Sequence, residues 1–271
     1  MSERQRANRE AQRGLVYRRF GQGEPVVLLH GIGHHWRAWE PVIADLATTN
    51  DVIAVDLPGF GRSPIPTPAP TGMAGLVDAV SAFFADEGFD RPHVAGNSLG
   101  GAIALELATG DRVRSATALS PAGFATPAEI RLALTVLGSM RAGTFGPAPV
   151  LRVLYRTKAG RWLAFNRLVV DAQRLSADRV MDDTLALRRG KGFRPVARAA
   201  RDYAFAARDF PVPVTVGWGT EDAILPYRQA ARARDRLPGA KHVDLTGCGH
   251  VPMSDDPQQV ADVIRATMSA C

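Results

Sequence analysis

The sequence predicts an α/β fold in which a mostly parallel sheet carries helices on both faces and is interrupted by a helical insertion. Short apolar runs alternate with helix-like segments up to Ser120, the alternation then stops, and strand-like residues return from Val212. Alternating strands and helices favour a parallel sheet that is covered on both faces. We therefore expect a core formed by residues 14–120 and 208–271. Residues 121–207 should form an inserted helical cap, and residues 1–13 should form a flexible tail.

The individual elements follow from short patterns along the chain. Runs of apolar residues that are typical of buried strands occupy residues 26–30, 52–56, 93–97, 116–120, 214–218 and 242–245. Helix-like segments lie between them, for instance at 74–87 and 102–108. Within the insertion, glycines at 138, 143, 146, 160, 190 and 192 break the chain into several helices. We expect these helices to cover the functional site.

Composition and length are those of one globular domain. The chain has 271 residues, of which 46% are hydrophobic and 22% charged, enough for a substantial core. It lacks any apolar run of about 18 residues, so no membrane-spanning helix is expected. The first 13 residues are polar and arginine-rich without an apolar stretch, which predicts a cytoplasmic protein rather than a secreted one. Cys248 and Cys271 alone make no disulfide framework.

Charge is distributed unevenly along the chain. Residues 131–208 hold 16 Lys and Arg but 5 Asp and Glu, a net charge of +11, whereas the whole chain carries +6. This excess either attracts anionic substrates or a membrane surface, or belongs to solvated helix faces, and the second interpretation is favoured. No nucleic-acid-binding module is recognisable. The predicted partner is a small-molecule substrate, without nucleic acid or stable membrane insertion, and the oligomeric state is left open.

Ser98 lies between two glycines at a predicted strand-to-helix turn. The segment Gly96 to Gly100 reads Gly-Asn-Ser-Leu-Gly and follows an apolar strand-like run. Such a turn is too tight for bulky flanking side chains, and it holds the serine in a strained conformation that presents its hydroxyl. The following helix directs its N-terminal amides at the same place, where negative charge is stabilised. Ser98 is therefore the candidate nucleophile.

A serine hydroxyl needs a base, and that base needs an orienting acid. Asp222 follows the strand-like run 214–218, and His250 follows the run 242–245. Ser98, Asp222 and His250 thus stand in the chain order of a Ser-Asp-His triad. Glu221 and Asp244 are alternative acids.

With these motifs in place, the chain resembles the α/β-hydrolase family from about residue 14 to residue 268. The segments that carry the resemblance are 26–33 with His-Gly-Ile-Gly, 56–63 with Asp-Leu-Pro-Gly-Phe-Gly-Arg-Ser, 96–100, 218–222 and 247–250. The resemblance is to the branch of serine esterases and lipases, or of carbon–carbon bond hydrolases, that carries a helical cap. It implies an oxyanion hole formed by the backbone amides of Ile32 and Leu99. It implies no cofactor and no metal, because the triad supplies nucleophile and base by itself.

Further residues are candidates for substrate contact near these motifs. They are Gly31, Trp36, Asn97, Phe124, Phe145, Leu225 and Val251. Leu134, Leu137 and Phe165 are additional candidates for an acyl pocket within the insertion.

Two other features near the motifs have competing interpretations. His34 and His35 suggest a metal site, but a role as pocket-lining loop residues is favoured because no further ligand cluster accompanies them. Cys248, two residues before His250, is interpreted as a small packing residue of that loop rather than as a nucleophile.

Three functions remain compatible with the sequence. The first is a serine hydrolase that cleaves a carboxylic ester of a small or lipid-like molecule through an acyl-enzyme. The second is a carbon–carbon bond hydrolase of ring-cleavage-type diketones, among which Gly-Asn-Ser is frequent. The third is a slow-turnover, receptor-like protein that keeps the fold. An aspartate would be needed at the nucleophile position for a haloalkane dehalogenase or an epoxide hydrolase, so Ser98 disfavours both.

Overall fold

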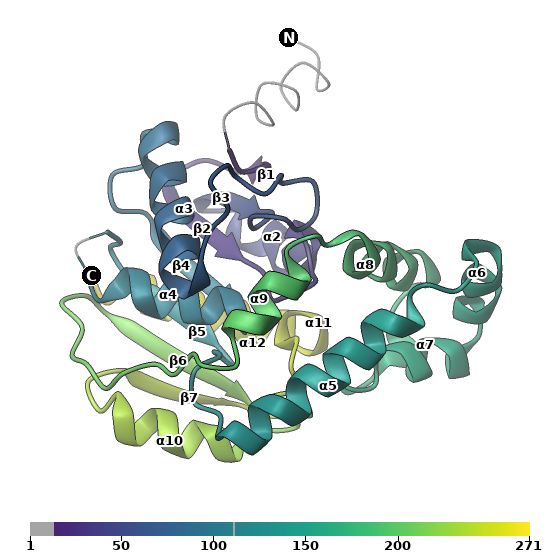
Figure 1. The fold of residues 1–271 in the computed structure, drawn as a ribbon. Helices are drawn as coiled ribbons and strands as arrows, with labels where there is room; N and C mark the ends of the chain where they lie inside the picture. The colour runs from purple at the N-terminus through teal and green to yellow at the C-terminus, as the bar shows by residue number, and fades with distance from the viewer. Residues whose placement is uncertain (1–13, 111) are drawn as a thin grey trace, which may run out of the picture.

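The computed structural model describes residues 14–110 and 112–271, so the predicted tail 1–13 lies outside the described residues. Its centre is a seven-stranded sheet (Figure 1). The strands are β1 (Tyr17–Phe20), β2 (Glu24–Leu29), β3 (Asn50–Val55), β4 (His93–Asn97), β5 (Ala116–Leu119), β6 (Val214–Gly219) and β7 (Lys241–Leu245). Their order is β1-β3-β2-β4-β5-β6-β7, with β1 antiparallel to β3 and all other neighbours parallel. The predicted α/β class, with a mostly parallel sheet, is confirmed.

Helices connect these strands. In the first half of the core they are η1 (Trp36–Trp39), α2 (Glu40–Leu46), α3 (Gly72–Glu87) and α4 (Leu99–Ala108). Between β5 and β6 they are α5 (Pro127–Gly143), α6 (Ala148–Arg156), α7 (Lys158–Phe165), η2 (Ala172–Arg174), α8 (Ala177–Arg189) and α9 (Phe193–Ala199). The last part of the chain contributes α10 (Arg228–Arg236), α11 (Pro252–Asp255) and α12 (Pro257–Met268).

The sheet separates two hydrophobic clusters. Alternate residues of a strand point to opposite faces, so Val27 and Leu29 join one cluster while Val26 and Leu28 join the other. Helices α3, α4 and α10 bury apolar side chains on the first face, and α2 and α12 on the second. Because both faces are covered, the central strands read as continuous apolar runs. That is why the sequence predicts them well.

Strand β1 is the one strand that the sequence analysis does not anticipate. It contains Arg18 and Arg19, pairs antiparallel at the sheet edge and is only partly buried. Arg19 forms an ion pair with Asp51 of β3 across this edge. An edge strand buries little apolar surface, so it lacks the apolar run by which the other strands are found.

Helices α5 to α9 form the segment between β5 and β6, which carries no strand among residues 121–207. Figure 1 shows that α5 leads away from the sheet toward α6 and α7, and that α8 and α9 return toward the core. The Thr126 side chain and Glu129 form a capping box that starts α5 sharply. Within the described residues, no helix has the length and apolar content needed to cross a bilayer.

Candidate active site

Ser98 occupies the turn between β4 and α4 in a strained conformation. Its φ of 56° and ψ of −110° lie outside the regions that most residues adopt. Its amide donates to the Leu119 carbonyl of β5 at 2.9 Å, and its own carbonyl accepts from Ala102 of α4 at 3.0 Å. The turn is thus fastened to the neighbouring strand and to the helix, which holds the strained residue in place. The Ser98 side chain points into a cavity described below.

The flanking glycines are required by close backbone approach. A Cβ atom on Gly96 would collide with the Gly100 carbonyl oxygen, and one on Gly100 would collide with the Leu29 carbonyl oxygen of β2. Both obstacles are backbone atoms that cannot rotate away, so no larger residue fits at either position. The local sequence therefore determines the geometry of the turn that presents Ser98.

His250 and Asp222 are joined by a buried hydrogen bond. His250 Nδ1 lies 2.8 Å from Asp222 Oδ2, and both side chains are almost fully buried. The other carboxylate oxygen of Asp222 accepts from the amides of Ile224 and Leu225 at 2.9 and 2.8 Å. Three donors thus surround one carboxylate in a fixed orientation, and this carboxylate sets the direction of the imidazole ring.

The two alternative acids lie elsewhere. Glu221 is exposed to solvent. Asp244 is half exposed and forms an ion pair with Arg234 of α10. Within the described part of the chain, neither carboxylate is hydrogen-bonded to His250, whereas Asp222 is. The geometry therefore favours Asp222 as the residue that orients His250.

The loop after β2 is held next to Ser98 by a neutral histidine. His30 Nε2 accepts from the Leu57 amide at 3.0 Å, while Nδ1 lies 2.7 Å from the Gly31 carbonyl and donates to it. Complete burial lowers the pKa of His30 to about 3, so the ring stays neutral and keeps both bonds. A Cβ atom on Gly31 would lie 3.3 Å from the Ser98 Cβ, which shows how closely the loop approaches the serine. Ile32 follows in this loop and borders the cavity.

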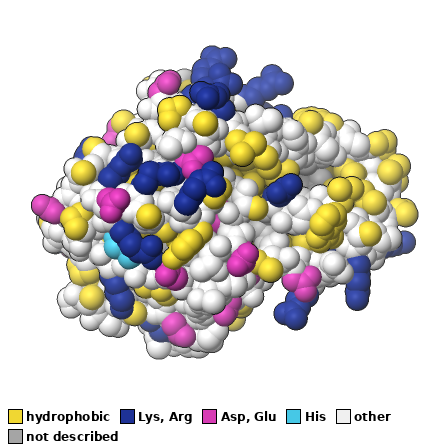
Figure 2. All heavy atoms as spheres, turned by 90° about the horizontal axis from the view of Figure 1, so that it is seen from below, with side chains coloured by type: hydrophobic (Ala, Val, Ile, Leu, Met, Phe, Trp, Pro, Cys, Tyr) yellow, Lys and Arg dark blue, Asp and Glu magenta, His cyan; other side chains and the backbone are white. Residues whose placement is uncertain are grey.

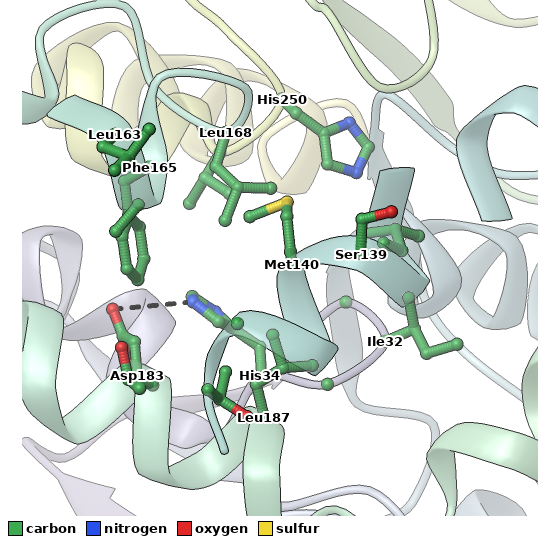
Figure 3. Close-up of a pocket in the computed structure, with 18 of the residues that line it drawn as sticks. Ile32, His34, Ser139, Met140, Leu163, Phe165, Leu168, Asp183, Leu187 and His250 are labelled. Carbon is green, nitrogen blue, oxygen red and sulfur yellow. Dashed lines mark ion pairs between the residues drawn. The ribbon is translucent and has the colours of Figure 1, made fainter. Parts of the chain in front are cut away.

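A cavity of about 330 Å³ opens above Ser98 and His250. Its walls come from the loops after β2, β4 and β7 and from helices α5, α6, α7 and α8. Most of the lining is apolar, and Figure 3 shows Met140, Leu163, Phe165, Leu168 and Leu187 around it, with His250 at one end. Its size and its mostly apolar lining with a few polar groups are those of a small-ligand site.

The residues predicted to contact substrate fall into two groups: those that line this cavity and those that do not. Gly31, Asn97 and Val251 line it, as do Leu137 and Phe165. Leu99 starts α4 directly after Ser98. The remaining candidates are placed differently.

Four predicted contacts do not line the cavity, and each has a packing role instead. Phe124 is fully buried in the core against Phe205 and Trp218, and Leu225 helps to hold Asp222 through its amide. Trp36 packs against Phe20 and Arg37. Phe145 lies on the surface, where the guanidinium groups of Arg141 and Arg188 stack on its ring. Leu134 also lies outside the cavity, in a shallow surface groove.

The His34 and His35 pair contacts a carboxylate of α8. His35 Nε2 and Arg179 Nε each lie 2.8 Å from Asp183, and His34 Nε2 lies 3.7 Å from it (Figure 3). Burial alone would raise the pKa of Asp183, but these three groups outweigh it and hold the pKa far below its ordinary range. His34 and Asp183 also line the cavity. The cluster thus joins the loop after β2 to α8, a contact that no motif indicates.

Two further observations bear on alternative chemistry. Within residues 14–110 and 112–271, no group of three or more His, Cys, Asp or Glu side chains has an arrangement that would hold a metal ion. Burial, together with the nearby Asp255 and Asp256, raises the pKa of the Cys248 thiol to about 12, which suppresses the reactive thiolate.

The fold and the site define an α/β-hydrolase. Residues 26–263 match the model of the alpha/beta hydrolase family, and the chain belongs to that family. One relative is the pimeloyl-(acyl-carrier protein) methyl ester esterase of Aeromonas hydrophila, which is 30% identical over 91% of this chain and 96% of that protein. The protein is therefore a hydrolase whose relatives include esterases.

Solved structures agree on the fold. The esterase RhEst1 from Rhodococcus sp. ECU1013 has a TM-score of 0.69 and 27% identity, covering 94% of each chain. A meta-cleavage product hydrolase from Pseudomonas fluorescens IP01 has a TM-score of 0.74 and 19% identity over 94% of each chain, a likeness that shows the fold alone.

Proposed function

We propose that this protein is a serine hydrolase that cleaves carboxylic esters of small or lipid-like molecules. Ser98 is the nucleophile, His250 the general base and Asp222 the acid that orients it. The observation that carries the proposal is the 2.8 Å hydrogen bond between His250 and Asp222 beneath a cavity that Ser98 and His250 both line. A nucleophile, a base and an orienting acid at one cavity are the requirements for acyl transfer.

The reaction follows from these positions. Ser98 Oγ attacks the ester carbonyl carbon, and its proton passes to His250 Nε2. The amides of Ile32 and Leu99 donate to the developing oxyanion, an interaction that typically contributes about 3 kcal/mol for each donor. His250 returns the proton to the leaving alcohol, and the acyl group remains on Ser98. A water molecule then gives its proton to His250 and attacks this acyl-enzyme, which releases the carboxylic acid and restores Ser98.

The segment 121–207 acts as a cap that selects the substrate. Four of its helices, α5 to α8, contribute walls to the cavity, and most of these wall residues are apolar. Apolar walls favour an ester whose acyl or alkyl part is a hydrocarbon, because that part leaves water on binding. The esterase named above among the relatives agrees with this class of reaction.

Carbon–carbon bond cleavage is not favoured by any residue of this site. The Asn97 side chain, which suggests it in the sequence, donates to the backbone carbonyls of Leu119 and His250 at 3.2 and 2.9 Å. Asn97 lines the cavity, and its side-chain amide also ties the turn that carries Ser98 to the loop that carries His250. A receptor-like protein with slow turnover would keep the same contacts and is distinguished by its rate.

The direct test is labelling with a fluorophosphonate, followed by turnover of p-nitrophenyl esters of graded chain length. We expect the label on Ser98, and we expect Ser98→Ala to keep the melting temperature while kcat falls by about 10⁴-fold or more. Label on another residue, or unchanged turnover in Ser98→Ala, contradicts the proposal. Turnover of a vinylogous diketone but of no ester would assign the second reaction instead.

A further inference from the structure

Helices α6 and α7 carry an apolar surface that no other part of the described structure covers. Its members, which we call the α6–α7 surface, are Val150, Val153, Leu154, Trp162 and Leu163. Val153 and Leu163 are 63% and 66% exposed, and Trp162 is 49% exposed. Figure 2 shows hydrophobic side chains gathered on the lobe that carries these helices. Contiguous apolar surface of this kind usually marks an interaction site in a water-soluble domain.

The exposure follows from the pattern of α6. Val150, Val153 and Leu154 are spaced for one helical face and are exposed, while Leu151 and Tyr155, next to them around the helix, are buried. These residues form one broad apolar band around the helix, which is wider than the part that the insertion buries. The buried part of this band contributes to folding, and in the part of the chain that the structure describes the exposed part makes no packing contact that would explain it.

The α6–α7 surface continues into the cavity. Leu154 and Leu163 belong to the surface and also line the cavity that contains Ser98 and His250. A hydrocarbon chain that contacts the surface therefore meets an apolar path toward the proposed nucleophile.

Among the described residues, exposed cations without ion pairs occur in and directly after helices α6 and α7. Arg152, Arg156, Lys158 and Arg167 are exposed, and none of them forms an ion pair with any acid within the described residues. Arg174, by comparison, is paired with Asp171. A segment that exposes both apolar side chains and cations is complementary to a surface that offers both hydrocarbon and negative charge.

We propose that the α6–α7 surface docks the protein on an anionic lipid surface, from which an ester enters the cavity. The docking part stands on exposure and charge alone, and the entry of an ester rests on the function proposed above. The apolar side chains enter the hydrocarbon boundary, the cations contact lipid phosphates, and the indole of Trp162 lies at the interface. An acidic protein partner is the competing occupant. It is less favoured because the patch opens into the substrate cavity.

Docking is measured by co-sedimentation of Ser98→Ala protein with vesicles, so that hydrolysis plays no part. Vesicles of phosphatidylcholine alone are compared with vesicles that contain phosphatidylglycerol. We expect at least tenfold stronger binding to the anionic vesicles and a large loss in 1 M salt, where the Debye length falls to about 3 Å. We also expect a blue shift of tryptophan fluorescence on binding that Trp162→Phe abolishes.

Matched variants distinguish binding through the α6–α7 surface from non-specific binding to vesicles. Val150→Ser with Val153→Ser should lower binding at least tenfold, while Leu132→Ser, equally exposed on α5 but outside the surface, should leave it unchanged. Arg152→Gln with Arg156→Gln should lower binding to anionic vesicles only, and the exposed Lys241 of β7 gives the control Lys241→Gln.

Three results overturn the proposal: no binding to anionic vesicles, equal binding by the valine double variant, or binding to an acidic protein in place of vesicles. The outcome is independent of the proposed reaction, because turnover of a short soluble ester is measured separately on protein with Ser98. A protein that cleaves the soluble ester without binding vesicles keeps the function and loses the docking surface. A protein that binds vesicles but cleaves no ester keeps the docking surface and contradicts the proposed function.

Discussion

Burial of His30 makes the stability of this protein sensitive to acid. The ring is completely buried, and its pKa falls from the ordinary 6.5 to about 3 because charging it there would cost solvation. The unfolded chain therefore binds a proton below about pH 6.5, and the folded chain does not. Stability from this group is fully present above pH 6.5 and is lost as the pH falls toward 3.

The size of the stability loss follows from the difference between the pKa of His30 in the folded and unfolded chain. Each group of this kind changes the free energy of unfolding by at most about 1.4 kcal/mol per pH unit within the window. Between pH 8 and pH 4.5, His30 should account for a loss of about 2–3 kcal/mol. The His30→Gln variant does not titrate there, and its side-chain oxygen can replace Nε2 as the acceptor for the Leu57 amide.

Urea unfolding of both proteins at four pH values between 8 and 4.5 measures this loss. The comparison uses the change with pH in each protein, so a constant cost of the substitution does not matter, and other titrating groups cancel. We expect the wild-type free energy of unfolding to fall by about 2–3 kcal/mol more than that of His30→Gln. Parallel pH profiles for the two proteins would refute the reasoning, because they would mean that His30 is accessible to protons in the folded state.

Three further predictions concern the site. Asp222→Asn should lower kcat by about 10⁴-fold with little change in KM, measured on a p-nitrophenyl ester, because the imidazole loses its orienting carboxylate. Leu137→Ala should lower kcat/KM for the preferred chain length by about tenfold relative to the shortest ester, since Leu137 lines the cavity. Gly100→Ala should lower the free energy of unfolding by about 3 kcal/mol or more in urea, because its Cβ meets the Leu29 backbone.

Matched controls come from the same elements or loops. Asp244→Asn removes an exposed acid that does not bond to His250, so its kcat should stay near wild type. Leu134→Ala lies one turn before Leu137 on α5 but outside the cavity, and it should not alter the chain-length profile. Gly138→Ala has open space around its Cβ and should stabilise α5 slightly. Equal effects in a variant and its control would contradict the corresponding prediction.

The motifs predict the position of the site because each of them is a local backbone requirement. A strand that turns tightly into a helix needs glycines such as Gly96 and Gly100, because a Cβ atom at either position would collide with a backbone carbonyl oxygen. The buried parallel strands appear as apolar runs for the same local reason. Edge strand β1, with Arg18 and Arg19, has no such signature and is found only in the folded structure.

Substrate contacts are harder to predict because an apolar residue looks the same in a core, in a pocket wall and on a surface. Phe124, Phe145 and Phe165 lie in one insertion, yet the first is buried core, the second is stacked with arginines on the surface, and the third lines the cavity. The position of each side chain depends on how helices α5 to α8 pack against one another and against the core. Helix packing is decided by contacts between residues far apart in sequence, which a single sequence does not reveal.

The fold class, the tight turn that presents Ser98 and the chain order of Asp222 and His250 can all be predicted from the sequence, because each depends on the backbone and on neighbouring residues. The identity of the acid that bonds to His250 depends on long-range packing, since two loops 28 residues apart bring Asp222 Oδ2 within 2.8 Å of His250 Nδ1. The contact of Asp183 with the histidine pair, across 148 residues, likewise depends on how α8 folds back over the core. The exposure of the α6–α7 surface also depends on tertiary packing, because a side chain is exposed or buried according to what packs against it.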